Sequence, residues 1–211
     1  ESDAEEAFGR DEAGIAFIGA GIAALAAYAL TRLKFLGAGL LTTAILITYL
    51  LPGTLIFIPL YQTLSDLGLI NSYGSLLVTY PTFLVPFATW VLIGYFRSIP
   101  KEIEEAALID GCSRVQTITR IMLPIAVPGL VTTMIYSFIA AWNEFLFGLT
   151  FIQSKQKMPL VLGLYNFVGR WTTQWELLNA AAFVALIPVL VLFYIIEKRL
   201  VAGLAGGAVK A

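Results

Sequence analysis

The sequence predicts an all-α integral membrane protein, and three observations lead to this fold class. Hydrophobic residues make up 59% of the 211 positions and charged residues only 13%, which leaves too little polar surface to cover a water-soluble globule. The charged residues gather in short clusters between long apolar runs. These runs reach the length of roughly 20 residues that a helix needs to cross a bilayer.

Five charge-free runs are predicted to be membrane-spanning helices, because a helix in lipid satisfies its own backbone hydrogen bonds. The second and third runs are longer than a bilayer requires, and Pro52-Gly53, Pro59, Pro81 and Pro86 interrupt them. Tilt, kinks and short ends outside the membrane would account for the surplus. The five runs are Ala13 to Thr31, Phe35 to Ser65, Leu67 to Phe96, Ile121 to Asn143 and Leu177 to Ile196.

The lysines and arginines predict how these helices are oriented. With the start of the chain outside, nine of the 13 basic residues fall on the inner side and four on the outer side, as the positive-inside rule describes. The segment from Lys101 to Arg120 is then cytoplasmic, and the longest outer segment runs from about Thr150 to Glu176. The inner residues are Arg32, Lys34, Arg97, Lys101, Arg114, Arg120, Lys198, Arg199 and Lys210, and the outer ones are Arg10, Lys155, Lys157 and Arg170.

Composition also excludes several kinds of site. A net charge of -1 provides no basic excess for nucleic acid. A single cysteine, Cys112, cannot form an intrachain disulfide, and without histidine the usual zinc clusters are absent, so we expect no metal. The chain has no GxxxxGKS or GxxxxGKT loop to hold the phosphates of ATP.

The chain is predicted to form one membrane domain, because no soluble domain, low-complexity linker or internal repeat is visible. We place this domain at residues 13–200, with a cytoplasmic loop at about 97–124 and a cytoplasmic C-terminal tail at 201–211. An acidic segment, residues 1–12, precedes the domain, and we assign no function to it.

The cytoplasmic loop is predicted to be a helix-turn-helix. Pro100 suits the start of a helix that ends near Ile109. Asp110-Gly111 predicts the stop, because glycine readily takes the left-handed conformation that closes a helix. Ser113 and Gln116 then have the spacing of a capping box and predict the start of a second helix.

The first helix of this loop has a distinctive composition. Glu102, Glu104 and Glu105 favour its N-terminal half, because carboxylates interact well with the positive end of the helix dipole. Ala106 and Ala107 leave the helix slim on one side. A slim helix can enter a cleft in another protein, although shape alone does not establish docking.

The loop resembles the signature of binding-protein-dependent ABC importer permeases. Three residues separate Glu105-Ala106-Ala107 from Gly111, nine residues separate Gly111 from Ile121, and one residue separates Ile121 from Leu123-Pro124. An ordinary amphipathic loop on the membrane surface would explain the charges and caps but not this spacing. The resemblance implies a type I ABC importer transmembrane domain whose coupling helix sits in a cleft of an ATPase subunit. The implied ATPase-coupling residues are Glu105, Ala106, Ala107, Asp110, Gly111, Leu123 and Pro124.

Three further stretches are similar to the carbohydrate-uptake branch of this family, in particular to the G subunit of the maltose transporter. They are Trp142 to Phe145, Pro159-Leu160 with Gly163-Leu164, and the ending from Leu200 to Lys210. The resemblance runs from about Gly21 to the C-terminus. It implies a permease subunit in a prokaryotic inner membrane that moves a sugar or oligosaccharide.

The same resemblance implies the partners and the source of energy. They are a homologous permease, two nucleotide-binding ATPase subunits, an external solute-binding protein and membrane lipid. ATP and Mg would be bound and hydrolysed on the ATPase subunits, so this chain is expected to be no enzyme and to bind no cofactor.

The resemblance also suggests a translocation pathway near Trp142, Asn143 and Glu144. An ionised carboxylate at the bilayer centre costs on the order of 3 kcal/mol, so Glu144 is expected to avoid lipid. One interpretation has Asn143 and Glu144 facing a wet pathway, where they bond sugar hydroxyls or a neighbouring subunit. The other interpretation places them at the level of the outer headgroups.

Two further contacts follow from the resemblance. The outer stretch Gly163 to Trp175 corresponds to a loop that probes the solute-binding protein, with Tyr165, Asn166 and Arg170 as contacts. The same residue types are also typical of an interfacial belt. The tail residues Gly203, Gly207 and Lys210 correspond to a segment that enters the interface between the ATPase subunits, although a flexible terminus is the alternative.

The number of spans departs from the family pattern, since members usually have six spans and start inside, whereas five are visible here. Two alternative functions stay open: an ABC permease for glycerol-phosphate or another polar solute, and an ion-coupled secondary transporter or channel. Paired charges within the spans would favour the second, and apart from Glu144 the spans carry none. A membrane scaffold without transport activity is a third possibility.

Overall fold

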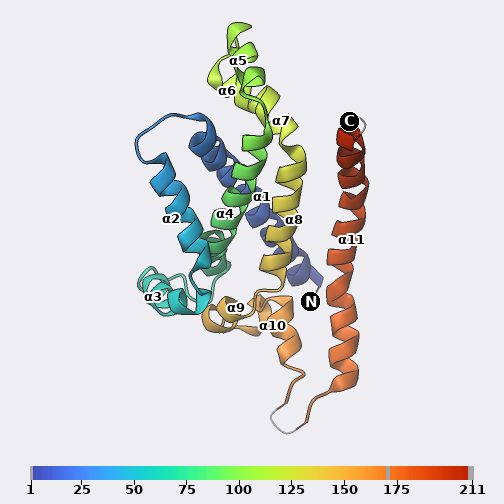
Figure 1. Ribbon diagram of the computed structural model, residues 1–211. Coiled ribbons are helices and arrows are strands. Elements are labelled where there is room, and N and C mark those ends of the chain that lie inside the picture. Colours follow the sequence, from blue (N-terminus) through green and yellow to red (C-terminus); the bar gives the residue numbers. More distant parts are fainter. Residues whose placement is uncertain (1, 170–171, 209–211) are drawn as a thin grey trace.

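The structure, a computed structural model, describes residues 2–169 and 172–208, with side chains over 14–169 and 172–194. This part of the chain is helical, and its only β pairing is an isolated bridge between Val168 and Thr173. Three helices, α1 (Ser2–Arg32), α4 (Tyr73–Ser98) and α8 (Val127–Trp142), pack against one another at the centre (Figure 1). The predicted all-α fold is confirmed.

The remaining helices surround this centre. α2 (Ala38–Leu50) packs on α4, and α11 (Trp175–Ala208) runs along one side of the molecule next to α8 (Figure 1). The short helices gather at the two ends of the bundle. One end carries α5 (Lys101–Ile109), α6 (Arg114–Thr117), the π-helix η1 (Ile118–Met122) and α7 (Leu123–Ile125), and the other carries α3 (Gly53–Asp66), α9 (Leu146–Phe151), the 3-10 helix η2 (Lys155–Lys157) and α10 (Leu160–Tyr165).

Small residues bring α1 close to its neighbours. Ala20, Ala23, Ala24 and Ala27 are almost completely buried, and small side chains at such an interface let helix backbones approach closely in a membrane. α1 therefore forms a tight unit with α4 and α8.

Two hydrophobic clusters fill the bundle. The cluster next to the α5–α7 end is built around Leu92, Phe96 and Met122, which are fully buried. The cluster toward the other end includes Tyr80 and Phe151 and draws in α3 and α9. Each end of the molecule thus has its own packed core.

Three of the predicted spans correspond to long helices. α1, α4 and α11 each contain a stretch that is long and apolar enough to cross a membrane. The third span begins later than predicted, at Tyr73 rather than Leu67. Residues 67–72 form turns instead, where Gly68 and Asn71 have positive φ angles of 68° and 59°.

The second and fourth predicted spans are bent helix pairs. α2 and α3 meet at 94° around Leu51 and Pro52, and the segment Arg114–Ile125 meets α8 at 73°. The first bend has a local cause, because a residue before proline avoids helical conformation, and Leu51 is extended at φ -68° and ψ 130°. Counting each pair as one span gives up to five spans among the described residues.

Pro81 and Pro86 do not break their span into separate helices, so this expectation is wrong. Both lie inside α4, which the structure describes as one continuous helix of 26 residues. α4 is packed between α1, α2 and α8, and such neighbours allow a membrane helix to tolerate proline. Pro59 likewise lies inside α3, so of these four proline sites only Pro52-Gly53 separates two helices.

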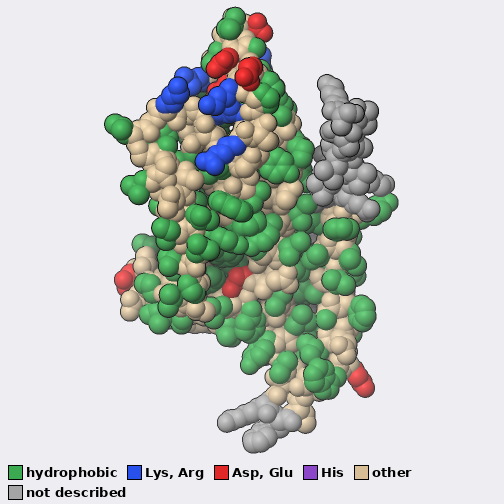
Figure 2. Space-filling model, viewed as in Figure 1, with side chains coloured by type: hydrophobic (Ala, Val, Ile, Leu, Met, Phe, Trp, Pro, Cys, Tyr) green, Lys and Arg blue, Asp and Glu red, His purple; other side chains and the backbone are tan. Residues whose placement is uncertain are grey.

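Basic side chains gather at the end of the bundle that carries α5 to α7, while the rest of the visible face is largely hydrophobic (Figure 2). Arg32 and Arg97 lie at the ends of α1 and α4, and Lys101 begins α5. Lys155 and Lys157 lie in η2 at the opposite end. Arg32, Arg97 and Lys101, which the sequence places on one side of the membrane, therefore lie at the end of the bundle opposite Lys155 and Lys157.

Candidate functional site

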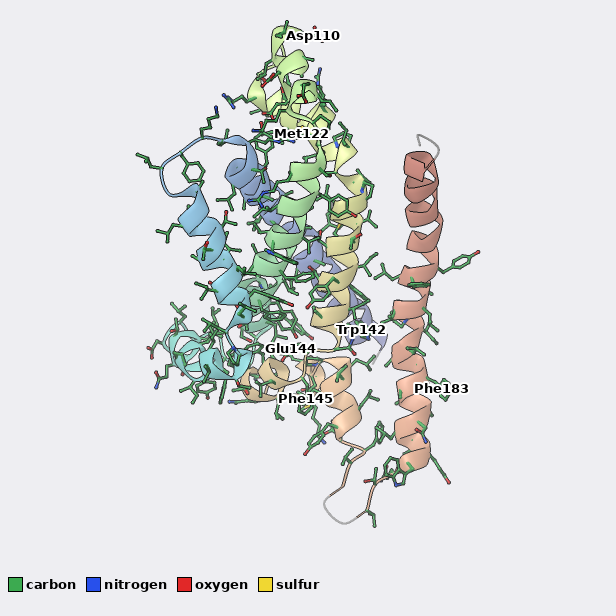
Figure 3. All side chains as sticks on the ribbon, in the orientation of Figure 1. Asp110, Met122, Trp142, Glu144, Phe145 and Phe183 are labelled. Atoms are coloured by element: carbon green, nitrogen blue, oxygen red, sulfur yellow. The ribbon has the colours of Figure 1, made fainter. Side chains whose placement is uncertain are left out.

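The turn after α5 is closed as the sequence predicts. The Cys112 N–H donates to the Ala107 carbonyl at 3.0 Å and the Gly111 N–H donates to the Leu108 carbonyl at 3.2 Å, the two bonds of a Schellman motif. Gly111 has a φ of +87°, a conformation that side chains disfavour. Asp110 lies at the very tip of the molecule (Figure 3).

The second half of the loop begins with the predicted capping box. The Ser113 N–H donates to Gln116 Oε1 at 2.8 Å, and the Gln116 N–H donates to Ser113 Oγ at 3.3 Å. α6 then widens into the π-helix η1, and Leu123-Pro124 begin α7. Pro124 has no N–H to donate to the preceding turn, and a π-helical turn is a frequent feature of functional sites.

The exposed surface of the loop is partly apolar. Ile109 is 85% exposed and Val115 69% exposed, on either side of the turn. Glu105 and Ala106 also face outward, whereas Ala107 is buried. The two alanines therefore do not share one slim surface, because consecutive residues point about 100° apart on a helix, and only Ala106 belongs to the exposed side.

One residue of the loop has a role that the sequence prediction missed. Glu104 is only 8% exposed, and its carboxylate does not serve the helix dipole at the surface. The Tyr28 hydroxyl donates to Oε1, and Arg32 Nε lies 3.6 Å from Oε2. The available signal was the spacing of Tyr28 and Arg32, which lie four residues apart and so share one face of α1.

The Glu144 carboxylate forms hydrogen bonds within the chain. It accepts hydrogen bonds from the N–H groups of Phe147 at 2.8 Å and Gly148 at 3.0 Å, so it caps the start of α9. The Tyr80 hydroxyl also reaches this carboxylate. Glu144 therefore connects α9 to α4 beside the end of α8 (Figure 3).

The other two pathway candidates point in different directions. The Trp142 indole N–H donates to the Ala185 carbonyl of α11 at 3.2 Å, and the ring is buried. The Asn143 amide is exposed and donates to the Ile139 carbonyl of its own helix at 2.8 Å. Of the three, only Asn143 presents a polar group outward, and its role in a pathway stays a prediction.

The segment after α9 is anchored by a residue that the sequence prediction did not name. Asn71 Oδ1 accepts hydrogen bonds from the N–H groups of Gln153 and Ser154 and from the Ser154 hydroxyl, and Lys157 Nζ donates to the Asn71 carbonyl at 2.8 Å. This single left-handed residue joins the turn before α4 to the segment after α9. A positive φ at a residue other than glycine is hard to predict from sequence, because it depends on the tertiary contacts that hold it.

The remaining predicted contacts are partly described. Tyr165 is 54% exposed and packs edge-on against Phe145 at 5.4 Å, and Asn166 is exposed at the end of α10. Gly203 and Gly207 lie in α11, which includes the predicted domain boundary at residue 200. Arg170 and Lys210 lie outside the described residues.

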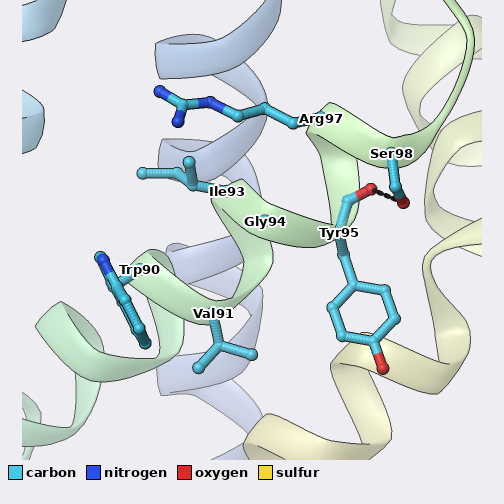
Figure 4. Close-up of a pocket in the computed structure, with 7 residues that line it drawn as sticks. All are labelled: Trp90, Val91, Ile93, Gly94, Tyr95, Arg97 and Ser98. Atoms are coloured by element: carbon cyan, nitrogen blue, oxygen red, sulfur yellow. Dashed lines mark hydrogen bonds between the residues drawn. The ribbon is translucent and has the colours of Figure 1, made fainter.

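Two surface hollows lie near the loop end of α4. The larger, about 510 Å³, is lined by residues of α4 alone, among them Trp90, Tyr95 and Arg97, and these side chains point away from one another (Figure 4). A solute site needs polar groups that converge, so we place none there. No cluster of His, Cys, Asp or Glu in the described part of the chain could hold a metal ion.

Comparison with known proteins decides what kind of protein carries this loop. Residues 19–205 match the family described as "Binding-protein-dependent transport system inner membrane component". The chain belongs to this family. The permease is therefore an inner membrane transport component rather than a catalyst.

Relatives of this permease cover most of its length. It is 37% identical over 90% of the chain to a putative ABC transporter permease protein, ORF1, of Streptomyces antibioticus, and spans 82% of that protein. It is 34% identical to the sulfoquinovosyl glycerol permease SmoH of Agrobacterium fabrum and 35% identical to the trehalose/maltose permease MalG of Thermococcus litoralis, over 90% of the chain in both cases. The chain spans 66% and 68% of those two proteins.

A solved structure supports the architecture. The transmembrane fold resembles a chain of a bacterial ABC transporter involved in alginate import, with a TM-score of 0.75, 22% identity, and coverage of 93% of this chain and 72% of that one. This likeness concerns the fold. The type I ABC importer fold predicted from the loop signature is confirmed.

Proposed function

We propose that this permease imports a carbohydrate and is driven by ATP hydrolysis on partner subunits that dock on the α5–α7 loop. The loop carries the proposal. It combines a rigid Schellman turn, a capping box and exposed apolar side chains at Ile109 and Val115. A stiff element with an exposed apolar surface suits a protein partner, and rigid docking elements can pass motion into a membrane domain.

The docking residues proposed on this surface are those of the signature. Glu105, Ala106 and Asp110 are exposed and suited to direct contact. Ala107 and Gly111 would act by shaping the helix and its turn, and Leu123-Pro124 by starting the helix that follows. ATP and Mg would be bound by the partner, which places the loop end of the bundle in the cytoplasm, in agreement with its basic side chains (Figure 2).

The substrate class is inferred from relatives. The names of SmoH and of MalG from Thermococcus litoralis refer to a sugar-bearing glycerol and to trehalose and maltose. Exposed Tyr165 and Asn166 at the opposite end provide the aromatic and amide groups that suit a sugar-loaded solute-binding protein. A second, homologous permease would complete the pathway, and Gly203, Gly207 and Lys210 would reach toward the ATPase subunits.

Reconstitution of the full complex tests this function. The permease, its partner permease, the ATPase and the solute-binding protein are assembled in lipid nanodiscs, and ATP hydrolysis is measured with and without the binding protein loaded with trehalose or maltose. We expect the loaded binding protein to stimulate hydrolysis. Uptake into vesicles that follows an ion gradient in the absence of ATP would contradict the proposal and favour a secondary transporter.

The same assembly tests the substrate class. Glycerol 3-phosphate replaces the disaccharides in both the binding and the hydrolysis measurement. Stimulation by glycerol 3-phosphate with none by the sugars would retain the ATP-driven permease and overturn the carbohydrate assignment.

A further inference from the structure

A buried ionic cluster lies where the coupling loop joins the bundle. Of the nine residues of α5, only Glu104 and Ala107 are buried. Glu104 accepts a hydrogen bond from the Tyr28 hydroxyl at Oε1 and faces Arg32 Nε at Oε2, and the side chains of Arg32 and Glu104 are 4% and 10% exposed. Glu104 therefore provides the polar attachment of α5 to α1.

The same arginine also holds the end of α4. Its Nη2 donates to the carbonyls of Phe96 and Ile99, each at 2.6 Å, which are at the C-terminal end of α4 and in the short link to α5. A guanidinium can hold several acceptors in one fixed geometry. Arg32 thus joins the last turn of α1 to the last turn of α4 and to the first turns of α5.

The second half of the loop also approaches this cluster. Arg114, the first residue of α6, lies close enough to the Tyr28 hydroxyl to interact with it electrostatically. Tyr28 and Phe96 are themselves members of the packed cluster shared by α1, α4 and α8, and their rings meet edge to face at 6.1 Å. Both helices of the loop therefore converge on a residue that is part of the bundle core.

Stability alone does not account for this arrangement. A buried ion pair is weak evidence for stability, because the cost of desolvating two charges offsets much of their attraction, and apolar residues of similar volume often serve as well. What the ion pair provides is one preferred geometry between elements. Here those elements are the proposed docking helix and the two central helices.

We infer that Tyr28, Arg32 and Glu104 are positioning residues that transmit displacement of α5 into α1 and α4. This inference rests on the proposed function and adds a route by which the docked loop moves the bundle. A partner that shifts α5 must either carry the inner ends of α1 and α4 with it or break the cluster. Glu104 is buried, whereas the next residue, the signature residue Glu105, is exposed. In this inference Glu104 attaches α5 to the bundle, and Glu105 contacts the docked partner.

Two substitutions test the inference in the reconstituted complex. Glu104→Gln keeps the size of the side chain and removes its charge, and Tyr28→Phe removes only the hydroxyl. Glu102→Gln is the matched control, with the same change on an exposed residue of the same helix. The measurements are the ratio of ATP hydrolysis with and without loaded binding protein, the amount of ATPase that copurifies, and the thermal stability of the complex.

We expect both variants to retain the ATPase and to lose stimulation by about tenfold, which is within the usual range for coupling between two sites. Glu102→Gln should keep the stimulation of the parent complex. The double variant Tyr28→Phe/Glu104→Gln should lose little more than Glu104→Gln alone, since residues that share one network are not additive.

The outcomes separate the inference from the proposed function. If the parent complex shows no stimulation, the proposed function fails and the inference fails with it. If the parent is stimulated and Glu104→Gln and Tyr28→Phe are stimulated equally, only the inference is overturned. The inference is also overturned if stimulation falls only in proportion to lost ATPase binding or lost thermal stability. If Glu104→Gln does not assemble, Tyr28→Phe alone decides.

Discussion

At the scale of single residues, Gly111 forms the left-handed turn of the loop on which we propose that the ATPase docks. Its φ of +87° closes α5, and a Cβ at this site would meet no neighbouring atom. Any penalty for a side chain is therefore conformational rather than a clash. A residue held in the left-handed region costs about 1–3 kcal/mol, with Asn among the most tolerant types and β-branched residues the least.

We predict that Gly111→Val abolishes stimulation of the partner ATPase, while the permease still inserts in the membrane. Gly111→Asn should retain a large part of the stimulation, because asparagine accepts this conformation. The measurement is ATP hydrolysis by the reconstituted complex at equal permease content. Equal activity of the Val and Asn variants would mean that the left-handed turn is not required.

Glu144 permits a second residue-level prediction. Its two carboxylate oxygens cap two N–H groups at the start of α9, whereas glutamine has one oxygen and would leave an N–H of the buried segment without an acceptor. We expect Glu144→Gln to lower the unfolding free energy by about 1–3 kcal/mol, measured as a lower midpoint of thermal unfolding.

Asn143→Ala is the control for that measurement, because the Asn143 amide is exposed and bonds only within its own helix. It should change stability little. If Glu144→Gln unfolds at the parent temperature but loses solute uptake, the carboxylate belongs to the pathway rather than to the cap.

At the scale of helices, the contact between α4 and α8 depends on one glycine. A Cβ at Gly129 would lie 2.6 Å from the ring of Tyr95, closer than real Cβ contacts, so the two helices would have to separate. Gly94, on α4, has no atom within 4 Å of its would-be Cβ. These two glycines form a matched pair, because an added Cβ would clash at Gly129 and would meet no atom at Gly94.

We predict that Gly129→Ala destabilises the permease by about 1–3 kcal/mol, the usual cost of overpacking a core, and that Gly94→Ala is nearly neutral. Thermal unfolding of the two purified variants in the same detergent gives the comparison. A neutral Gly129→Ala would show that the Tyr95 ring can move aside without cost.

The helices also show which parts of the architecture a sequence can predict. Hydropathy and capping rules depend on neighbouring residues, so the apolar stretches within α1 and α11, the Gly111 turn and the Ser113 capping box were predictable. The extension of α1 back to Ser2 and of α11 on to Ala208 was not predicted. The 94° bend between α2 and α3 was visible as Pro52-Gly53, but its size was not, because it depends on packing of α3 against α4 and α9. The burial of Glu104 was out of reach for the same reason, since its partners lie 72 and 76 residues earlier in the chain.

At the scale of the whole molecule, burial is uneven. About 44% of the membrane-crossing stretch of α1 and of α4 is buried within the chain, against 6% for α11. Phe183 on α11 is 74% exposed and points away from the bundle (Figure 3). Over Trp175–Tyr194, α11 is attached by the bond from Trp142 to the Ala185 carbonyl and by contacts with α8 and α10, so most of the apolar surface of this stretch is left for lipid or another subunit.

We predict that Phe183→Arg reduces the amount of assembled complex in the membrane, because an arginine at the centre of a membrane helix costs about 3 kcal/mol. Phe183→Leu, which keeps the surface apolar, should assemble normally. Quantification of the permease and its partner permease after membrane extraction distinguishes the two. Normal assembly of Phe183→Arg would indicate that this side of α11 faces water or a polar partner.

The turn that closes α5 has a practical consequence for following the permease at work. Cys112, the single cysteine of these 211 residues, donates its N–H to complete that turn and is partly exposed next to Gly111. A thiol-reactive fluorophore can therefore be attached at the tip of the loop through this thiol. The emission of such a label would report, in real time and from the native side chain, each engagement and release of whatever binds there.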